Sequence, residues 1–585
     1  MPNSAKRCLY ILLVMALLWL TEVLPIPITA LLPLVMFPMA SVMKASETSQ
    51  AYISDTSMLF IGGLIVAVAV EESNLHKRIA MLVFMLIGSD PKWMMAGLML
   101  PTWFLSMWIS NTATAAMMIP IAEAVLLQIK SVNEENLTEL QDSNDHSSSD
   151  PENSISENIN SSSHDGLKED KGVLNPVFIS DISATETVTT ERESKMKTDA
   201  GSEEEPESPI QKKASKSEDS GYLRLCRGLT LCIAYASNIG GIATLTGTAP
   251  NLILKGNADR FYQSAQARNG TEQTGSPISF SNWMVLALPM SALTLVLGWL
   301  LLVIFFISGR GCCTYKKRQA LAIKKLVRDE WRKLGKFTLA EVEVLILFVC
   351  LAILWISRDP GESPGWGRWF SKDYVSDSTA AMLISVLLFM LPAKLPNLFC
   401  WYKEERSLEP VWKPLLTWEQ VNRKLPWGVI ILLGGGFALA KGVEKSHLDK
   451  WLAHKLEGLG SLDGWVLNLV LCLIVATVTE VTSNSATAAL LMPILANLGI
   501  SVGISPLYLM TSSAIATSFA FMLPVATPPN AIVFTYGYIR VVDMASVGFF
   551  MNIIAVAVLT LAVNTWGKFV YNFDEIEPYF QKSSP

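Results

Sequence analysis

Long apolar runs separated by short polar breaks dominate the pattern of this chain. The run Val285–Ser308 exceeds the roughly 20 residues that a helix needs to cross a bilayer. Leu9–Leu20, Val344–Ile356 and Phe549–Val563 are further apolar runs. A segment in hydrocarbon must satisfy its own backbone hydrogen bonds, so these runs predict helices. We expect roughly ten to thirteen spans or half-spans, and therefore an all-α, polytopic integral membrane protein.

Residues 131–222 interrupt this pattern with a long polar stretch. They are rich in Ser, Glu, Asp, Asn and Lys and poor in aromatic residues. Such a composition cannot bury enough apolar surface to offset the entropy lost on ordering, which predicts a disordered loop. Two sequons, Asn136-Leu-Thr and Asn160-Ser-Ser, would suit the outside, whereas phosphorylatable serines would suit the cytosol. The side of this loop therefore stays open.

A second polar stretch, residues 309–337, is strongly basic. Its segment Tyr315–Lys336 holds nine Lys or Arg residues against two acids, and its apolar residues recur at helical spacing. This combination predicts a basic amphipathic helix at a membrane surface. Because positive charge favours the cytoplasmic side, we expect this helix to lie in the cytoplasm.

The chain also contains an internal repeat. Three pairs of segments match: Gly62–Ala80 with Gly435–Ala453, Ser110–Ile121 with Ser483–Ile494, and Gly247–Leu254 with Ala526–Val533. The first two pairs share an offset of 373 positions, and the third has an offset of 279. The offsets differ by about the length of the polar loop, so that loop is interpreted as an insertion.

The repeat predicts the domain organisation of the whole chain. Residues 1–130 and 223–308 form the first repeat, residues 131–222 the inserted loop, residues 309–337 the interfacial helix and residues 338–585 the second repeat. Each repeat contains breaks within its apolar runs. Paired, discontinuous helices in two inverted repeats are typical of secondary transporters, whose sites form where the breaks meet.

Composition narrows the class of function further. The chain is 51% hydrophobic and 17% charged. Its net charge of −6 comes from the polar loop, which holds 22 Asp and Glu residues against 8 Lys and Arg residues. Nucleic acid is not an expected partner. Eight cysteines show no C-x-x-C pair, which argues against a zinc site or a disulfide framework. The absence of a G-x-x-x-x-G-K-[ST] loop argues against ATP-driven transport of the P-loop kind. Nothing in the pattern indicates an enzyme.

Two short polar motifs lie inside apolar surroundings. Ser110-Asn111-Thr112 and its repeat Ser483-Asn484-Ser485 carry hydroxyl and amide groups at membrane depth, where polar groups are expensive and usually functional. These groups donate to the oxygens of an anion, and their own oxygens can bind a sodium ion. Glu480 stands beside the second motif; it fits either a proton sensor or, as we prefer, a structural hydrogen-bond acceptor.

The Thr-x-Pro-Asn breaks add backbone groups to this chemistry. Pro250, Pro528 and Pro529 lack a backbone donor and end regular helix, which frees carbonyl oxygens for a small cation. Helix N-termini at the breaks favour an anion. No arginine lies in the motifs, so we expect neutral dipoles and two or more co-bound sodium ions to hold a dianion.

These motifs resemble those of the divalent anion–sodium symporter family. The segments SMWISNTATAAMM, GGIATLTGTAPN, TEVTSNSATAALLMPI and FAFMLPVATPPNAIVFTYG carry the resemblance, which covers nearly the whole chain outside the polar loop. It implies a sodium-coupled plasma-membrane symporter of dicarboxylates, citrate or sulfate. It also implies a homodimer in lipid, with re-entrant hairpins, a scaffold domain and a transport domain that moves as an elevator.

The resemblance also implies two sets of site residues. The residues expected to contact the substrate carboxylates are Ser110, Asn111, Thr112, Ser483, Asn484, Ser485, Thr527 and Pro528. One sodium site is expected at Ser106, Ser110, Asn111, Thr246 and Gly247, and a second at Thr479, Thr482, Asn484 and Ala526.

The identity of the anion stays open among related acids. The segments TGTAPN and VATPPNAIVF resemble those of carboxylate carriers, so a succinate-type dicarboxylate is preferred, then citrate, then sulfate. Ser485 departs from the residues expected at this position in dicarboxylate carriers. The competing classes are a sodium-independent anion exchanger or channel on the same scaffold, and a receptor-like protein whose polar loop binds partners.

Overall fold

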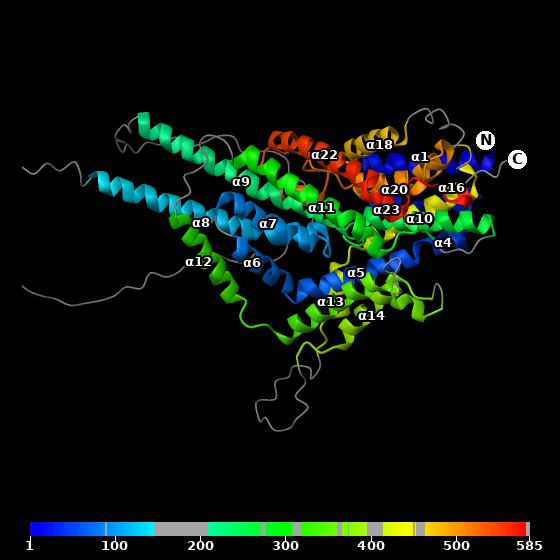
Figure 1. The fold of residues 1–585 in the computed structure, drawn as a ribbon, viewed down its shortest axis with the longest axis horizontal. Helices are drawn as coiled ribbons and strands as arrows, with labels where there is room; N and C mark the ends of the chain where they lie inside the picture. Colours follow the sequence, from blue (N-terminus) through cyan, green and yellow to red (C-terminus); the bar gives the residue numbers. More distant parts are fainter. Residues whose placement is uncertain are drawn as a thin grey trace, which may run out of the picture. The chain divides into compact units, whose positions relative to one another are not determined.

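The protein is helical throughout the part of the chain that the structure describes. The computed structural model describes residues 1–87, 90–145, 209–270, 275–307, 317–359, 365–371, 374–394, 413–448, 451 and 463–580 (Figure 1). Within these residues no β-strand forms, apart from one isolated bridge between Pro392 and Pro414. The chain divides into a unit of residues 1–133 and 217–585 and a unit of residues 134–216.

The helices before the basic stretch include both long and short segments. They are α1 (Asn3–Thr21), α2 (Ile26–Thr29), α3 (Leu32–Met39), α4 (Ala45–Tyr52), α5 (Asp55–Glu72), α6 (Leu75–Ile87), α7 (Pro91–Ser106), α8 (Asn111–Asp145), α9 (Pro209–Ala243), α10 (Ala249–Arg268) and α11 (Phe280–Leu302), which a π-helical turn, Val303–Ile307, extends.

The helices from the basic stretch onward also include both long and short segments. They are α12 (Lys317–Lys333), α13 (Leu339–Arg358), α14 (Asp377–Met390), α15 (Trp418–Lys424), α16 (Trp427–Lys445), α18 (Gly464–Val478), α19 (Asn484–Val502), α20 (Pro506–Ala516), α21 (Pro528–Thr535), α22 (Val541–Asn564) and α23 (Trp566–Tyr571), with 3₁₀ turns at Trp366–Trp369 and Pro578–Phe580.

The apolar runs form helices of membrane-spanning length, which confirms the all-α, multi-pass prediction. Among the described residues, seven helical segments are long and apolar enough to cross a bilayer, and three shorter apolar helices accompany them. Residues 285–307 of the first predicted run lie in α11 and its π-helical extension, and Ser308 is outside the described residues. The runs Val344–Ile356 and Phe549–Val563 lie in α13 and α22.

The structure differs from the sequence-based prediction at both ends of the polar loop. α8 continues to Asp145, and α9 begins at Pro209, so helix covers both flanks of residues 131–222. Once a helix is nucleated, each added residue gains one backbone bond, which lets it extend into polar sequence. Residues 146–208, including Asn160, lie outside the described residues. The predicted basic helix is present as α12.

A buried ion pair ties the end of α12 to the membrane helices. Arg78 on α6 donates through Nε to Glu341 Oε1 at 2.6 Å, and its Nη atoms donate to the carbonyls of Leu334, Gly335 and Lys336. Five guanidinium donors suit several acceptors at once, so this single side chain caps the segment between α12 and α13.

Non-helical segments between consecutive helices position the candidate site. α7 and α8 meet at a non-helical tip of residues 107–110, and α18 and α19 meet at one of residues 479–483. α9 gives way to α10 across residues 244–248, and α20 to α21 across residues 517–527. α19 packs against α10, α16 and α20, which brings the second-half breaks beside an element of the first half.

Candidate functional site

The first Ser-Asn motif stands where α8 begins. Ser106, the last residue of α7, has its Oγ 2.7 Å from Asn111 Oδ1 and 2.7 Å from the carbonyl oxygen of Ser237 on α9. Ser237 Oγ donates in turn to the Asn111 carbonyl at 2.7 Å. Ser110 Oγ accepts from the backbone N–H of Ala113 at 3.3 Å. The tip is therefore held by hydroxyl and amide groups.

The second Ser-Asn motif repeats this arrangement where α19 begins. Thr479, just after α18, has its Oγ1 2.7 Å from Asn484 Oδ1 and 2.8 Å from the carbonyl oxygen of Thr517, just after α20. Thr479 and Asn484 lie 373 positions after Ser106 and Asn111. The sequence repeat is thus also a repeat of hydrogen bonds.

The two Thr-x-Pro-Asn breaks match still more closely. Thr248 has φ −146° and ψ 148°, and Thr527 has φ −145° and ψ 150°, so each threonine is extended before a helix with proline in its first turn. Pro fits that position because its missing N–H has no helical partner there. Extended threonine followed by proline therefore sets the same entry into α10 and α21.

An asparagine holds each of these breaks in shape. Asn251 Nδ2 donates to the carbonyls of Gly241 at 3.2 Å and Thr244 at 2.8 Å. Asn530 Nδ2 donates to the carbonyls of Ala520 at 3.0 Å and Leu523 at 2.9 Å. These pairs are related by the offset of 279. The asparagines satisfy carbonyls that an uninterrupted helix would have satisfied with backbone N–H groups.

Two glycines allow the backbone to come close at the first break. A Cβ added to Gly241 would stand 2.5 Å from Asn111 Oδ1, and one added to Gly247 would stand 2.6 Å from the Gly241 carbonyl oxygen. Real Cβ atoms do not approach so closely. A larger residue at position 241 would therefore displace the Asn111 amide, and one at position 247 would displace the Gly241 carbonyl.

The predicted site residues divide into linked and unlinked groups. Hydrogen bonds link Ser106 with Asn111 and Thr479 with Asn484. Thr482 Oγ1 instead lies 2.7 Å from Thr487 Oγ1 and 2.9 Å from the Val478 carbonyl oxygen.

The predicted site residues also differ in their exposure to solvent. The buried ones are Ser106, Thr246, Gly247, Thr479, Ala526 and Thr527. The half-buried ones are Ser110, Asn111, Thr482, Ser483, Asn484 and Ser485, and the exposed ones are Thr112 and Pro528.

Adjacent residues of α9 link the two halves of the site. Ser237 bonds to Asn111 of the first half, whereas Asn238 Nδ2 lies 3.3 Å from Thr527 Oγ1 and 3.3 Å from Asn530 Oδ1 of the second. Sequence reasoning missed these residues, together with Asn251 and Asn530. Of these four residues, only Asn251 and Asn530 could have been found from the sequence, because each follows a proline in the repeated Thr-x-Pro-Asn segments.

Glu480 is a buried carboxylate at the second tip, and it serves as a structural acceptor. Its oxygens accept from the backbone N–H groups of Phe521 at 2.9 Å, Met522 at 3.0 Å and Leu523 at 3.2 Å. Asn552 Nδ2 donates to it at 2.7 Å. These contacts agree with the role of structural hydrogen-bond acceptor that the sequence analysis preferred for Glu480. The carboxylate clamps the unwound chain that leads into α21.

The arrangement offers a cation neutral oxygen atoms. Within the described residues, no group of three or more His, Cys, Asp or Glu side chains could hold a metal ion. Buried oxygens that have no hydrogen-bond partner include Asn251 Oδ1 at the first break and Ser518 Oγ at the second. Carbonyl, amide and hydroxyl oxygens are hard ligands of the kind that suit hard cations rather than soft metals.

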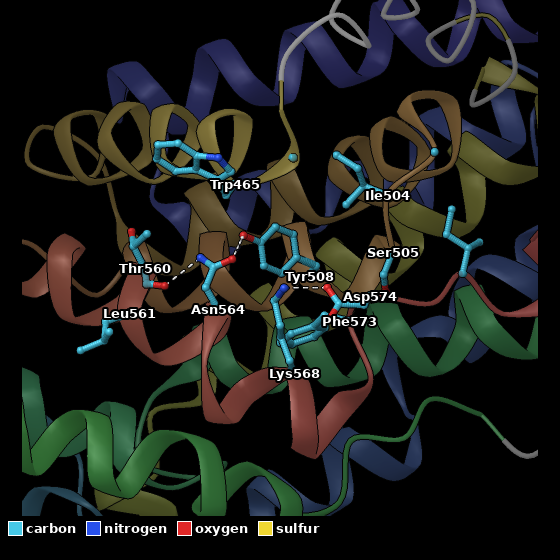
Figure 2. A pocket seen from close by; sticks show the side chains of 13 residues that line it. Trp465, Ile504, Ser505, Tyr508, Thr560, Leu561, Asn564, Lys568, Phe573 and Asp574 are labelled. Carbon is cyan, nitrogen blue, oxygen red and sulfur yellow. Dashed lines mark hydrogen bonds and ion pairs between the residues drawn. The ribbon is translucent and has the colours of Figure 1, made fainter.

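A cavity of about 660 Å³ is lined by residues outside these motifs. Figure 2 shows the side chains that line it. Its wall includes Tyr508, whose hydroxyl donates to Asn564 Oδ1 at 2.9 Å. It also includes Lys568, whose Nζ forms an ion pair with Asp574 Oδ1 at 2.7 Å. None of the predicted site residues lines it. The breaks, and not this cavity, therefore remain the candidate site.

Comparison with known proteins finds close relatives along the whole chain. The family described as the sodium:sulfate symporter transmembrane region matches residues 1–573. Solute carrier family 13 member 2 of Homo sapiens is 40% identical over 100% of this chain and 92% of its own length. The Na(+)/citrate cotransporter of Rattus norvegicus is 39% identical, covering 98% and 92%. The Na(+)/dicarboxylate cotransporter 3 of Mus musculus is 36% identical, covering 98% and 89%.

Solved structures were compared as well. The YdaH transporter of Alcanivorax borkumensis aligns with a TM-score of 0.49 at 12% identity, covering 97% of this chain and 99% of that one.

Proposed function

The chain belongs to the sodium:sulfate symporter family, and from this premise we propose that it is a sodium-coupled symporter of di- and tricarboxylate anions, with succinate-type dicarboxylates preferred. It is a multi-pass integral membrane protein and a transporter, not an enzyme. The observation that carries the proposal is the pair of matching half-sites, each built from a Ser-Asn tip and a Thr-x-Pro-Asn break.

Neutral groups of both half-sites bind the anion in this proposal. The proposed substrate contacts are Ser110, Asn111, Thr112, Ser483, Asn484, Ser485, Thr527 and Pro528. α8, α10 and α19 begin at the breaks, and their N-termini favour negative charge. Hydrogen bonds to an ionised carboxylate are stronger than those between neutral groups, so amide and hydroxyl donors suffice.

Sodium supplies the positive charge that the half-sites lack. We propose one ion at Ser106, Ser110, Asn111, Thr246 and Gly247, and a second at Thr479, Thr482, Asn484 and Ala526. Asn111 and Asn484 each belong to one sodium site and also to the proposed substrate contacts. Binding of the sodium ion therefore orients the amide that meets the anion. Co-bound sodium thereby offsets the charge of the dianion and couples the two fluxes.

The larger architecture is part of the same proposal. We propose a homodimer in the plasma membrane, with a transport domain that carries the site across the bilayer as an elevator. The ring of the tip residue Trp108 stacks on that of Trp355 of α13, with 6.5 Å between the ring centroids, and the centroid of the Phe280 ring lies 4.4 Å from that of Trp355. An apolar, aromatic contact of this kind suits a surface that slides.

Citrate is the second candidate substrate, because the Rattus norvegicus relative is named for it. The test is uptake of labelled succinate by cells that express the chain, in sodium and with choline in its place. Unlabelled succinate, citrate and sulfate serve as competitors, and surface biotinylation measures expression. We expect uptake that requires sodium and that succinate inhibits more strongly than citrate, and citrate more strongly than sulfate.

Each other outcome would change a different part of the proposal. Stronger inhibition by citrate would make the chain a citrate carrier and would direct attention to Ser485. Equal uptake in choline would overturn sodium coupling and favour an exchanger or a channel. Surface expression without uptake of labelled succinate, or of labelled citrate or sulfate in its place, would overturn the substrate class.

A further inference from the structure

A third sequon stands at the end of α10, outside the polar loop. Asn269, Gly270 and the next residue, Thr271, form an Asn-x-Thr sequence of the type that accepts N-linked glycans on surface loops. Asn269 is the C-terminal cap of α10, and its Nδ2 donates to the Ala265 carbonyl at 3.2 Å. We propose that Asn269 is an N-glycosylation site on the extracellular face of the protein, and that Asn136 and Asn160 are not modified.

The position of α11 decides on which side of the membrane Asn269 lies. The connection that contains Asn269 enters the N-terminal end of α11, whereas α12 follows the C-terminal end. The helical segment Phe280–Ile307 between them is one of the seven of membrane-spanning length. The two ends of one span lie on opposite sides, and the basic α12 favours the cytoplasm. Asn269 is therefore extracellular.

The same reasoning places the other two sequons in the cytoplasm. A Cβ added to Gly228 of α9 would stand 3.1 Å from Phe306 Cβ, so the start of α9 in the membrane lies beside the end of α11 that leads to α12. Tyr222 of α9 donates to the Leu126 carbonyl of α8 at 3.1 Å, so the polar loop leaves and re-enters at this end. Chain connectivity then keeps its sequons on the cytoplasmic side.

Asn269 has the room and the reach that a glycan needs. Both Asn269 and Gly270 are exposed, and a Cβ added to Gly270 would meet no atom of the described residues within 4 Å. α10 runs for 20 residues beyond the break at Thr248, which corresponds to about 30 Å of helix axis. Half of the hydrocarbon core is only about 15 Å thick. With the break near the bilayer midplane, as is typical of discontinuous helices in transporters, the acceptor lies clear of the lipid.

Buried contacts hold the base of this connection independently of its tip. Gln266 Nε2 donates to the Gly275 carbonyl at 3.4 Å, and Gln266 Oε1 accepts from the Gly275 N–H at 3.2 Å. Asp259 Oδ1 accepts from the Ser276 N–H at 3.2 Å and from its hydroxyl at 2.5 Å. Modification of Asn269 therefore leaves the packing of α10 and α11 intact.

The first experiment follows the glycan by its removal. The full chain is expressed in mammalian cells, and its mobility is compared before and after digestion with peptide-N-glycosidase F. We expect a single sensitive glycan that Asn269→Gln abolishes and that Asn136→Gln, Asn160→Gln and Thr271→Ser leave in place. The serine variant is the matched control, because it alters the same sequon without destroying it. Sensitivity that survives Asn269→Gln, or no sensitive form at all, would overturn the proposal.

A second experiment tests the membrane side without relying on the modification. Asn269→Cys is treated with a membrane-impermeant maleimide on intact cells, beside the parent chain and Arg332→Cys on α12. We expect labelling of Asn269→Cys from outside, whereas Arg332→Cys, exposed on the basic helix, reacts only after permeabilisation. Protection of Asn269→Cys in intact cells would refute the extracellular position, and with it the proposal. Neither experiment depends on which anion is carried.

Discussion

The two half-sites share their geometry but not their charge. At the tips, Ser106 meets Asn111 as Thr479 meets Asn484, with both oxygen-to-oxygen distances 2.7 Å. At the breaks, the equivalent threonines differ by only 1° in φ and 2° in ψ. Repeated sequence has therefore produced repeated backbone conformation, down to the hydrogen bonds of single side chains.

The differences lie in what supports each break. The position equivalent to Glu480 in the first half is Met107, whose carbonyl accepts from the Thr244 hydroxyl at 2.5 Å. Asn530 Oδ1 lies 3.3 Å from Asn238 Nδ2, whereas its equivalent, Asn251 Oδ1, is buried without a partner. The second half is thus clamped by a carboxylate and an amide that the first half lacks. We infer that duplication preserved the shape of the site while its electrostatics diverged.

The strongest test of the shared geometry removes the amide of each tip. We expect Asn111→Ala and Asn484→Ala each to lower sodium-dependent uptake at least about tenfold, since a hydrogen bond to a charged group contributes about 1.5–3 kcal/mol. Uptake is measured at equal surface expression. Asn497→Ala is the control, because the Asn497 amide bonds only within α19, to the Pro493 carbonyl, among the described contacts. Normal uptake by either tip variant would show that its half-site does not bind substrate or sodium.

An intermediate effect is expected when the clamp of the second half is neutralised. Glu480→Gln keeps the size of the side chain but replaces one acceptor oxygen with a donor, which leaves at least one N–H of residues 521–523 unpaired. An unsatisfied buried group costs about 1–3 kcal/mol, so we expect lower thermal stability in detergent and a several-fold loss of uptake. Glu419→Gln on α15, at an exposed carboxylate, should change neither quantity. An unchanged Glu480→Gln protein would mean that the two breaks do not differ in support.

The smallest effect is expected where the second half is made to resemble the first. Asn238→Ala leaves Asn530 Oδ1 without its amide partner, as Asn251 Oδ1 already is. A neutral hydrogen bond contributes about 0.5–1.5 kcal/mol, which corresponds to roughly a two- to tenfold rise in the sodium concentration that half-saturates uptake. Sodium titration of uptake measures it, with Ser237→Ala as the counterpart that faces the first half. A loss as large as that of Asn484→Ala would instead make Asn238 part of the binding site.

The sequence by itself determined the class of fold, the class of protein and the places where helices break. Apolar runs of spanning length require helices because hydrocarbon offers backbone groups no other partners. Proline and the paired motifs marked the breaks at Thr248 and Thr527, since proline removes a backbone donor wherever it stands. These are local consequences of composition and covalent structure, and no knowledge of neighbours was needed to predict them.

Only the tertiary structure decided which side chains support the breaks. Ser237, Asn238 and Glu480 lie far along the chain from several of their partners, and a single polar residue in an apolar helix looks the same whether it binds a neighbouring helix or a ligand. The helical flanks of the polar loop were hidden for a similar reason, because a helix started by its membrane part extends into sequence that would not begin one. Hydrogen bonds between distant segments depend on how helices pack, and packing is set by the whole chain at once.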